Sequence, residues 1–286
     1  MFVSIYRTTL KNLVRSVLFW LMFALLIGIP FMRAVQGFHG YYSMELGEMI
    51  MDTDPRYILD VRCYVQSIAN TCSSTMLYAM PLFAIVSVAL ILSRDYGDGF
   101  YEVECAGGRR PIHFLFGRIT TLLTVNFLAF LVVVFFANHW YVFTRGGVDG
   151  METVTYLWDS TVRILRHAVC LDWPSIAMYI CFTYALGTVF RNGWAAAAVA
   201  SGYVLLNYLF NRQLQFRIPK WYGEYLAPAP KKLQYYLHYY DSPWFEQTLE
   251  SMKTSLSLAI GCLGILLGAA AVYCLISYLR IRCREI

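Results

Sequence analysis

Long apolar blocks separated by charged connectors dominate the sequence. Six segments contain no Asp, Glu, Lys, Arg or His, and they cover residues 16–32, 75–92, 119–137, 175–190, 194–210 and 255–279. Crossing the hydrocarbon layer takes about 20 helical residues, whereas a barrel strand needs only about 10. The pattern predicts an all-α integral membrane protein with six transmembrane helices, over about 16–32, 75–92, 114–137, 174–190, 194–210 and 255–279. The fourth and fifth flank Arg191-Asn192-Gly193, which indicates a tight helical hairpin.

Residues 2–15 carry a helical repeat of their own. Apolar residues recur at intervals of three and four, at Phe2, Tyr6, Leu10 and Leu13, and basic residues form a separate stripe at Arg7, Lys11 and Arg15. Two such stripes are typical of an amphipathic helix that lies in the membrane interface. We therefore expect an interfacial (elbow) helix before the first span. The alternative is a basic flank that only fixes orientation.

Composition and charge agree with this picture. Hydrophobic residues make up 58% of the chain and charged residues 14%, against about 25% charged in soluble domains. With both termini cytoplasmic, the inner segments carry 11 basic and 5 acidic residues, and the outer loops are 33–74, 138–173 and 211–254. Because Lys and Arg concentrate on the cytoplasmic side, this topology is the predicted one. The net charge of +5 then reflects topology, and we expect a lipid bilayer and no nucleic acid as partner.

Several chemistries have no signature in the sequence. The six charge-free blocks offer no carboxylate or histidine for a proton-driven carrier. Phosphate-cradling loops, metalloprotease motifs and metal-binding cysteine spacings are also missing. We therefore expect neither enzymatic activity nor a cofactor or metal in this chain. The cysteines of the outer loops leave two alternatives open, a Cys63–Cys72 disulfide or unpaired thiols.

The connector after the second span, residues 93–113, is long and carries charges of both signs. Arg94 to Gly99 is expected to form a turn, and Phe100–Ala106 is expected to form a short helix that ends at Gly107-Gly108. Connections in helical bundles usually need only about 2–8 residues. Aromatic rings that fill a cleft and charges that select a partner are what a docking element requires. The alternative is a solvated turn.

Here the sequence resembles a known family. The order Asp95-Tyr96, Gly99, Gly107, Arg110 and Gly117-Arg118 is similar to the connector between the second and third spans of permeases of type-2 ABC exporters. A lysine is usual in that family at the position of Arg118. The resemblance implies one permease domain over 1–286, in a multi-pass protein of a bacterial cell membrane.

The resemblance also implies partners and sites. A separate cytosolic ABC ATPase would bind ATP and Mg²⁺, and a second copy or a related permease would complete the exporter. The ATPase-coupling residues would be Asp95, Gly99, Phe100, Tyr101, Glu102, Glu104, Gly107, Arg109 and Arg110. The substrate path for an amphipathic peptide, drug or lipid-linked molecule would include Tyr78, Met80, Phe83, Tyr203, Asn207 and Tyr208.

Two other functions stay open at this point. One is a non-transporting membrane scaffold or immunity protein that binds a peptide or partner. The other is an intramembrane enzyme or secondary carrier. Co-purification with an ATPase would favour the exporter, binding without stimulated hydrolysis would favour the scaffold, and turnover by the isolated chain would favour the third.

Overall fold

The computed structural model of the chain describes residues 2–36, 40–43, 48–51, 79–97, 111–144, 166, 168–212, 221–228, 233 and 255–282. Its long helices are α1 (Phe2–Val14), α2 (Val17–Gln36), α5 (Met80–Gly97), α7 (Pro111–Thr144), α9 (Trp173–Phe190), α10 (Gly193–Arg212) and α13 (Leu256–Arg282). The single-turn π-helices η2 (Ala168–Asp172) and η3 (Tyr222–Leu226) and the strands β1 (Gly40–Ser43) and β2 (Glu48–Met51) complete the described elements.

A helix is present at each of the six predicted spans. Four helical segments are long and apolar enough to cross a membrane, namely Met80–Gly97, Ile112–Val133, Val169–Phe190 and Leu256–Arg282. A fifth is added if α1 and α2 count as one bent span. The chain is therefore a multi-pass membrane protein. That α2 and α10 also cross the bilayer, giving six spans, stays a prediction.

One predicted boundary was wrong, and two other segments hold more structure than expected. The helix expected to end at residue 92 continues to Gly97, so Arg94 to Gly97 are helical and not the start of a turn. The third span, expected at 114–137, lies in the longer helix α7. The outer loop 33–74 contains an antiparallel hairpin of β1 and β2, which the all-α class did not include. A charged residue ends an apolar block in the sequence. A helix can continue through it when the charge is paired, as Asp95 is with Arg118.

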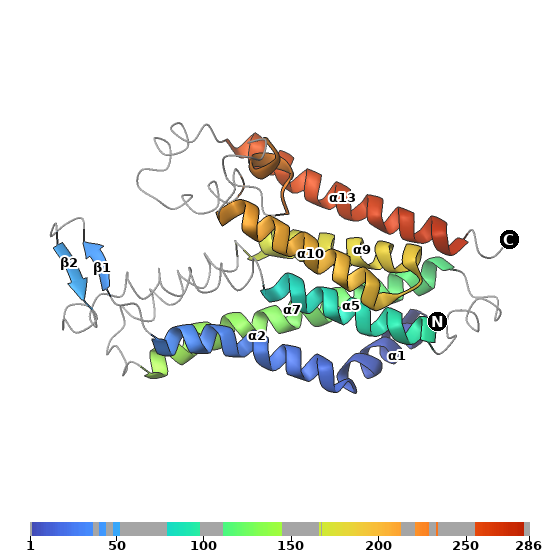
Figure 1. Cartoon of the computed structure of the whole chain (residues 1–286), viewed down its shortest axis with the longest axis horizontal. Coiled ribbons are helices and arrows are strands. Elements are labelled where there is room, and N and C mark those ends of the chain that lie inside the picture. Colours follow the sequence, from blue (N-terminus) through green and yellow to red (C-terminus); the bar gives the residue numbers. More distant parts are fainter. Residues whose placement is uncertain are drawn as a thin grey trace.

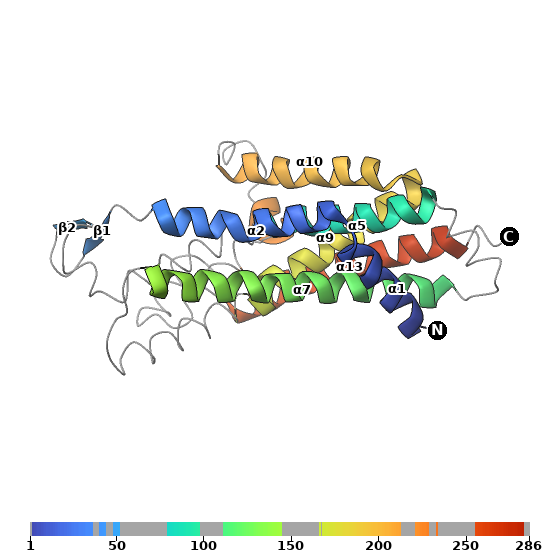
Figure 2. The same cartoon turned by 90° about the horizontal axis from the view of Figure 1, so that it is seen from below.

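The long helices run side by side, and α1 lies at one end of the bundle (Figures 1 and 2). The ends of α5 and α13 and the turn between α9 and α10 lie at the same end, called here the α1 end (Figure 1). Its exposed basic residues are Arg7, Lys11, Arg15, Arg94, Arg191, Arg280 and Arg282. No acidic side chain is exposed at this end in the described part of the chain. This asymmetry is what a cytoplasmic face requires.

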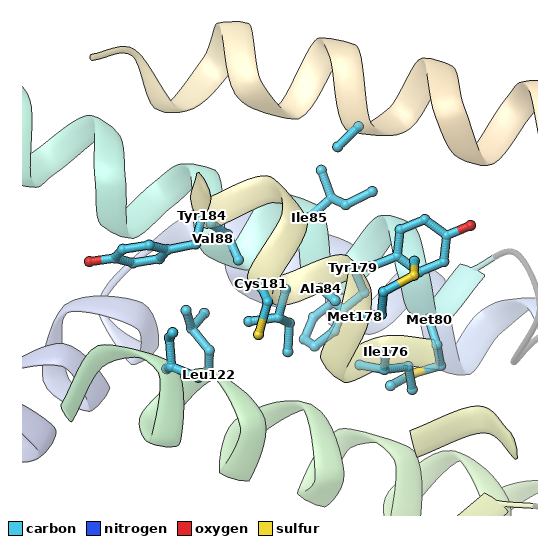
Figure 3. Close-up of a cluster of buried hydrophobic side chains, with 14 of the residues drawn as sticks. Met80, Ala84, Ile85, Val88, Leu122, Ile176, Met178, Tyr179, Cys181 and Tyr184 are labelled. Carbon is cyan, nitrogen blue, oxygen red and sulfur yellow. The ribbon is translucent and has the colours of Figure 1, made fainter. Parts of the chain in front are cut away.

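The core lies between α5 and α9. Figure 3 shows this cluster, with Met80, Ala84, Ile85 and Val88 from α5, Leu122 from α7, and Ile176, Met178, Tyr179, Cys181 and Tyr184 from α9. Helix α9 also packs along α13 and α10. By contrast, large apolar side chains of α2, α10 and α13 are exposed, which suits helices that face lipid.

The predicted hairpin at Arg191-Asn192-Gly193 is confirmed. Arg191 closes α9 in the left-handed conformation with φ 54°. The Asn192 side-chain oxygen then accepts the backbone N–H groups of Trp194 at 2.9 Å and Ala195 at 3.1 Å, and so caps α10. At Gly193 an added Cβ would lie 2.6 Å from the Ala89 carbonyl oxygen. Only glycine therefore allows α10 to approach α5 so closely.

Small residues have different surroundings on the two last helices. Ala196 and Ala200 of α10 are completely buried. Gly261, Gly264 and Gly268 of α13 have open space where a Cβ would be. Small residues in membrane helices usually allow close packing of helices within one subunit. These alanines pack in that way, and these glycines do not.

Two thiols provide a direct test of the packing between α9 and α13. The sulfur of Cys274 lies 3.3 Å from that of Cys181. A small rotation of the side chains would bring them to disulfide distance. We expect copper–phenanthroline oxidation of intact membranes to link the two helices, detected by mass spectrometry of the joined peptides. Cys274→Ser should abolish this link, and Cys262→Ser should leave it unchanged. Oxidised membranes without the linked peptide would contradict the packing.

Candidate functional site

A buried ion pair lies at the α1 end of the bundle. Arg118 of α7 is 1% exposed and Asp95 of α5 is 2% exposed, and the Nη2 atom of Arg118 donates to Oδ1 of Asp95. The guanidinium carbon of Arg118 also lies 5.0 Å from the centre of the Phe114 ring. Charged side chains are rarely buried so deeply without a partner of opposite charge. The pair therefore joins the end of α5 to the first part of α7.

A third member of the cluster comes from the amphipathic helix. The Nη1 atom of Arg118 donates to the hydroxyl of Thr9, at 2.6 Å. The same hydroxyl donates to the Ile5 carbonyl, at 2.7 Å. Ile5, Thr9 and Leu13 are spaced four residues apart and are all buried. This face of α1 therefore packs onto the bundle, and Thr9 is its polar contact with the ion pair.

The helical prediction for residues 2–15 is confirmed, with a correction to its apolar face. Phe2 is 39% exposed, and Tyr6 and Leu10 are only partly buried, so most of the predicted stripe lies beside the packed face. The basic stripe is exposed as expected.

Gly117, next to Arg118, allows the close contact between α1 and α7. A Cβ at this position would lie 2.8 Å from Cγ2 of Ile5, closer than two carbon atoms can pack. The Gly117 carbonyl accepts the hydroxyl of Thr121 at 2.7 Å. The two residues of the dipeptide Gly117-Arg118 thus have separate roles. Gly117 leaves room for Ile5 of α1, and Arg118 supplies the positive charge that pairs with Asp95.

The bend between α1 and α2 is fixed by local hydrogen bonds. The two helices meet at 72°. The indole N–H of Trp20 donates to the Val14 carbonyl at 2.7 Å, and the Ser16 amide donates to the Leu13 carbonyl at 3.0 Å. These bonds satisfy carbonyl groups at the end of α1 that have no partner inside the helix. The bend holds α1 over Asp95 and Arg118.

The predicted coupling residues have different positions relative to this cluster. Asp95 is buried and paired with Arg118, and its role in coupling to an ATPase stays a prediction. Gly99, Phe100, Tyr101, Glu102, Glu104, Gly107, Arg109 and Arg110 lie outside the described residues. Residues 98–110 join α5 to α7, so the ion pair ties together the two helices from which the connector leaves and returns.

Two of the predicted path residues come together at the opposite end of the bundle. The Tyr203 hydroxyl lies 2.9 Å from that of Tyr222 in η3, which donates to Oδ1 of Asn207 at 3.1 Å. The Asn207 amide donates to the Tyr203 carbonyl at 2.9 Å. The Tyr203 ring packs against Phe182, with ring centres 5.5 Å apart. This polar cluster connects α10 to η3 and is bordered by aromatic rings.

Met80 and Phe83 do not join this cluster. Met80 is completely buried and Phe83 is 1% exposed. The ring centre of Phe83 lies 5.4 Å from that of Phe19 in α2. Both side chains therefore fill the core, and neither lines an open path in this structure. Tyr78 and the side chain of Tyr208 lie outside the described residues.

The helix boundaries also bring charged residues into the candidate spans, where the sequence blocks had none. Asp95 and Arg118 are two of these residues. Another buried one is Asp172, which is 9% exposed directly before α9, inside the segment Val169–Phe190. No side-chain hydrogen bond from Asp172 caps α9. A carboxylate inside a membrane span is a candidate functional group by default.

The sequence signals for two members of these clusters were incomplete. Thr9 lies four residues from both Ile5 and Leu13, a spacing that marks one helical face, but a threonine on an apolar face gives no sign of its partner. Tyr222 was one of many aromatic residues in the loop 211–254, and nothing local distinguishes it. Only the fold brings each beside its partner.

Comparison with known proteins does not assign the chain to a family. No protein-family model matches the chain, and no curated protein is similar to it in sequence.

The buried ion pair predicts a specific pattern of stability. Arg118→Met leaves the Asp95 carboxylate buried without its cation, so we expect a loss of about 3–5 kcal/mol in the free energy of unfolding. Adding Asp95→Asn removes the uncompensated charge, and the double variant should be more stable than Arg118→Met alone. Unfolding in detergent, followed by circular dichroism, measures both.

The control is Arg280→Met, which removes an exposed charge at the same end of the bundle. It should change stability by no more than about 0.5 kcal/mol. If Arg118→Met costs no more than this control, the pair does not hold α5 and α7 together.

Proposed function

We propose that the chain is the membrane-spanning subunit of an ATP-driven exporter of the type-2 ABC class. The observation that carries the proposal is the placement of Asp95, Arg118 and Thr9. They bind α1, α5 and α7 into one unit close to the two points where the connector of residues 98–110 meets the bundle. The three helices cannot move separately without exposing or breaking a buried ion pair. A force that a partner applies to the connector would therefore displace all three helices together.

The direction of coupling follows from this placement. A force on the connector acts on the end of α5 and the start of α7 together. The contact between Thr9 and Arg118 passes the same displacement to α1, which continues into α2. Buried contacts of this kind have few alternative arrangements, so they move as rigid bodies. In the proposed exporter, closure of the ATPase supplies the force.

The energy source is proposed to be a separate subunit. The sequence has no phosphate-cradling Gly-x-x-x-x-Gly-Lys-[Ser/Thr] loop, so ATP and Mg²⁺ would be bound by a cytosolic ABC ATPase at the α1 end. The exposed basic residues at that end support its placement in the cytoplasm. A second copy of the chain, or a related permease, would complete the transporter in a bacterial cell membrane.

The cluster of Tyr203, Asn207 and Tyr222 bears on the substrate. It combines two phenol groups and an amide with the aromatic rings of Tyr179 and Phe182. Sites that bind small molecules typically have apolar walls with a few placed polar groups. An amphipathic peptide, drug or lipid-linked molecule is the substrate class that matches this chemistry, and a lone ion is not.

Asp172 favours a second candidate function, that of a proton-driven carrier. Its carboxylate is nearly buried inside a candidate span, the position that proton relays in transporters use. Asp172 also directly precedes α9, where the helix dipole favours a negative charge, so a structural role explains it too. Asp172→Asn separates the two functions. A carrier loses uptake driven by a proton gradient in vesicles without ATP, whereas the exporter shows no such uptake in wild type or variant.

The proposed exporter is tested by isolating the full chain from its own membranes. We expect an ATPase to co-purify with the chain and its ATP hydrolysis to be vanadate-sensitive. Phe100→Ala with Tyr101→Ala should reduce recovery of this ATPase, because buried aromatic side chains often dominate interfaces, each worth about 2 kcal/mol or more.

The matched control is Trp194→Ala, which removes an exposed aromatic ring at the same end of the bundle. It should leave ATPase recovery unchanged, and all variants should insert normally in the membrane. Purification of the wild-type chain without any ATPase would contradict the exporter. Equal recovery with the connector variant would contradict the role of the connector.

A further inference from the structure

The surface of α1 has three faces that differ in chemistry. The face that packs on the bundle consists of Ile5, Thr9 and Leu13. The residue directly after each of these lies about 100° further round the helix, and together these residues form what we call the apolar flank, which consists of Tyr6, Leu10 and Val14. The second residue after each packed one lies about 200° round the helix, and these residues are the basic stripe, Arg7, Lys11 and Arg15. The apolar flank therefore separates the packed face from the basic stripe.

The basic stripe has no counter-charge on its own helix. Residues 2–15 contain no Asp or Glu. All three basic side chains are exposed, and none of them forms an ion pair within the described part of the chain. The carboxylate of Asp95 pairs with Arg118 in the interior. The stripe therefore presents its positive charges to the surface that lies beside α1.

The apolar flank is not covered by the bundle either. Val14 is 43% exposed, and Tyr6 and Leu10 are half-buried. An apolar flank beside a basic stripe is typical of a helix that lies in the membrane interface, where the apolar side chains contact acyl chains and the basic ones stay at the headgroups. A soluble partner would have to match both faces of the same short helix.

The orientation of α1 agrees with a place in the interface. Helix α2 runs side by side with the helices that are able to span a membrane, and α1 meets it at 72° (Figures 1 and 2). The axis of α1 is therefore close to the plane of the membrane. Trp20, directly after the bend, is half exposed, and tryptophan is enriched at the level of lipid headgroups.

The charge of the stripe selects between lipids. Zwitterionic headgroups have no net charge, whereas an anionic leaflet attracts each Lys or Arg near its surface with an energy that corresponds to about a fivefold gain in affinity. The absence of acidic residues from 2–15 means that nothing on this helix offsets that attraction. An anionic leaflet is therefore the surface that complements the stripe.

We propose that α1 binds the anionic phospholipids of the leaflet at the α1 end, with its basic stripe at their phosphates and its apolar flank among the acyl chains. The stripe exists only while α1 is helical, and a helix of 13 residues is marginal alone. Lipid that binds the stripe therefore stabilises the helix. Because Thr9 accepts from Arg118 on the packed face, the lipid also stabilises the contact of α1 with the ion pair.

The test compares the full chain in two kinds of nanodisc. One contains phosphatidylcholine alone, and the other contains phosphatidylcholine and phosphatidylglycerol with the same acyl chains. Amide hydrogen exchange, followed by mass spectrometry, should be slower in α1 and in the first turns of α7 when phosphatidylglycerol is present. Arg7→Gln, Lys11→Gln and Arg15→Gln should each reduce this difference in α1 by about fivefold. Equal exchange of wild-type α1 in both nanodiscs would overturn the proposal.

The matched control compares two double variants. Arg7→Gln with Lys11→Gln should lose most of the lipid dependence, whereas Arg280→Gln with Arg282→Gln removes the same charge from the same end of the bundle and should keep it. An equal loss in the control would show only a general attraction between basic protein and acidic lipid, and the assignment to α1 would be wrong. A response of α1 without one in α7 would refute the link through Thr9. Circular dichroism confirms that each variant is folded.

A second measurement locates the lipid on α1. Phosphatidylglycerol with a diazirine in its acyl chain is incorporated into the nanodiscs, and labelled residues are identified by mass spectrometry after illumination. The proposal expects labels on Leu10 and Val14 and none on Ser4, which is exposed on the side of the basic stripe. Equal labelling of Ser4 would contradict the orientation of α1. Absence of label from the whole helix would mean that its surface faces water or a soluble partner, and the lipid assignment would be wrong. The proposal rests on the membrane location of the chain and needs no ATPase, so it and the exporter function can fail separately.

Discussion

The ion pair between Asp95 and Arg118 is the interaction on which the α1 end of the bundle depends. Each charge would be too costly to bury alone, so the end of α5 and the start of α7 must stay together. The second donor of Arg118 reaches Thr9 and adds α1 to the same unit. Gly117 makes this geometry possible, because any side chain at that position would push Ile5 and its helix away.

The two ends of the bundle are built differently. At the α1 end, charges are either paired in the interior or exposed as a basic surface around the bend of α1 and α2. At the other end, η3 docks onto α10 and α13 through neutral groups, as in the contact of Tyr222 with Asn207 and of the Cys262 thiol with the Glu224 carbonyl. The charged α1 end, with the connector attached to it, suits the reception of a force from a partner. The neutral, aromatic end suits contact with a substrate. The proposed exporter assigns them these tasks.

Apolar blocks allowed the helices to be predicted well, because length and hydropathy alone decide whether a segment suits a membrane. The same rule failed at the end of α5, where Arg94 and Asp95 looked like the start of a turn. Asp95 stays helical and buried because its partner lies 23 residues further along the chain, and no local pattern contains that information. The motif quoted for the family resemblance contains both Asp95 and Arg118, but it gave no sign that they face each other. Thr9 and Tyr222 were missed for the same reason.

The central claim is that Asp95 and Arg118 hold α1, α5 and α7 as one unit. Amide hydrogen exchange of the full chain in lipid nanodiscs tests it most directly, since local opening sets the exchange rate of each helix. In Asp95→Asn, the protected amides of α1, of the last turns of α5 and of the first turns of α7 should all exchange faster and by similar factors, while those of α9 and α13 keep their rates. Faster exchange in α5 alone, with α1 and α7 unchanged, would contradict the claim.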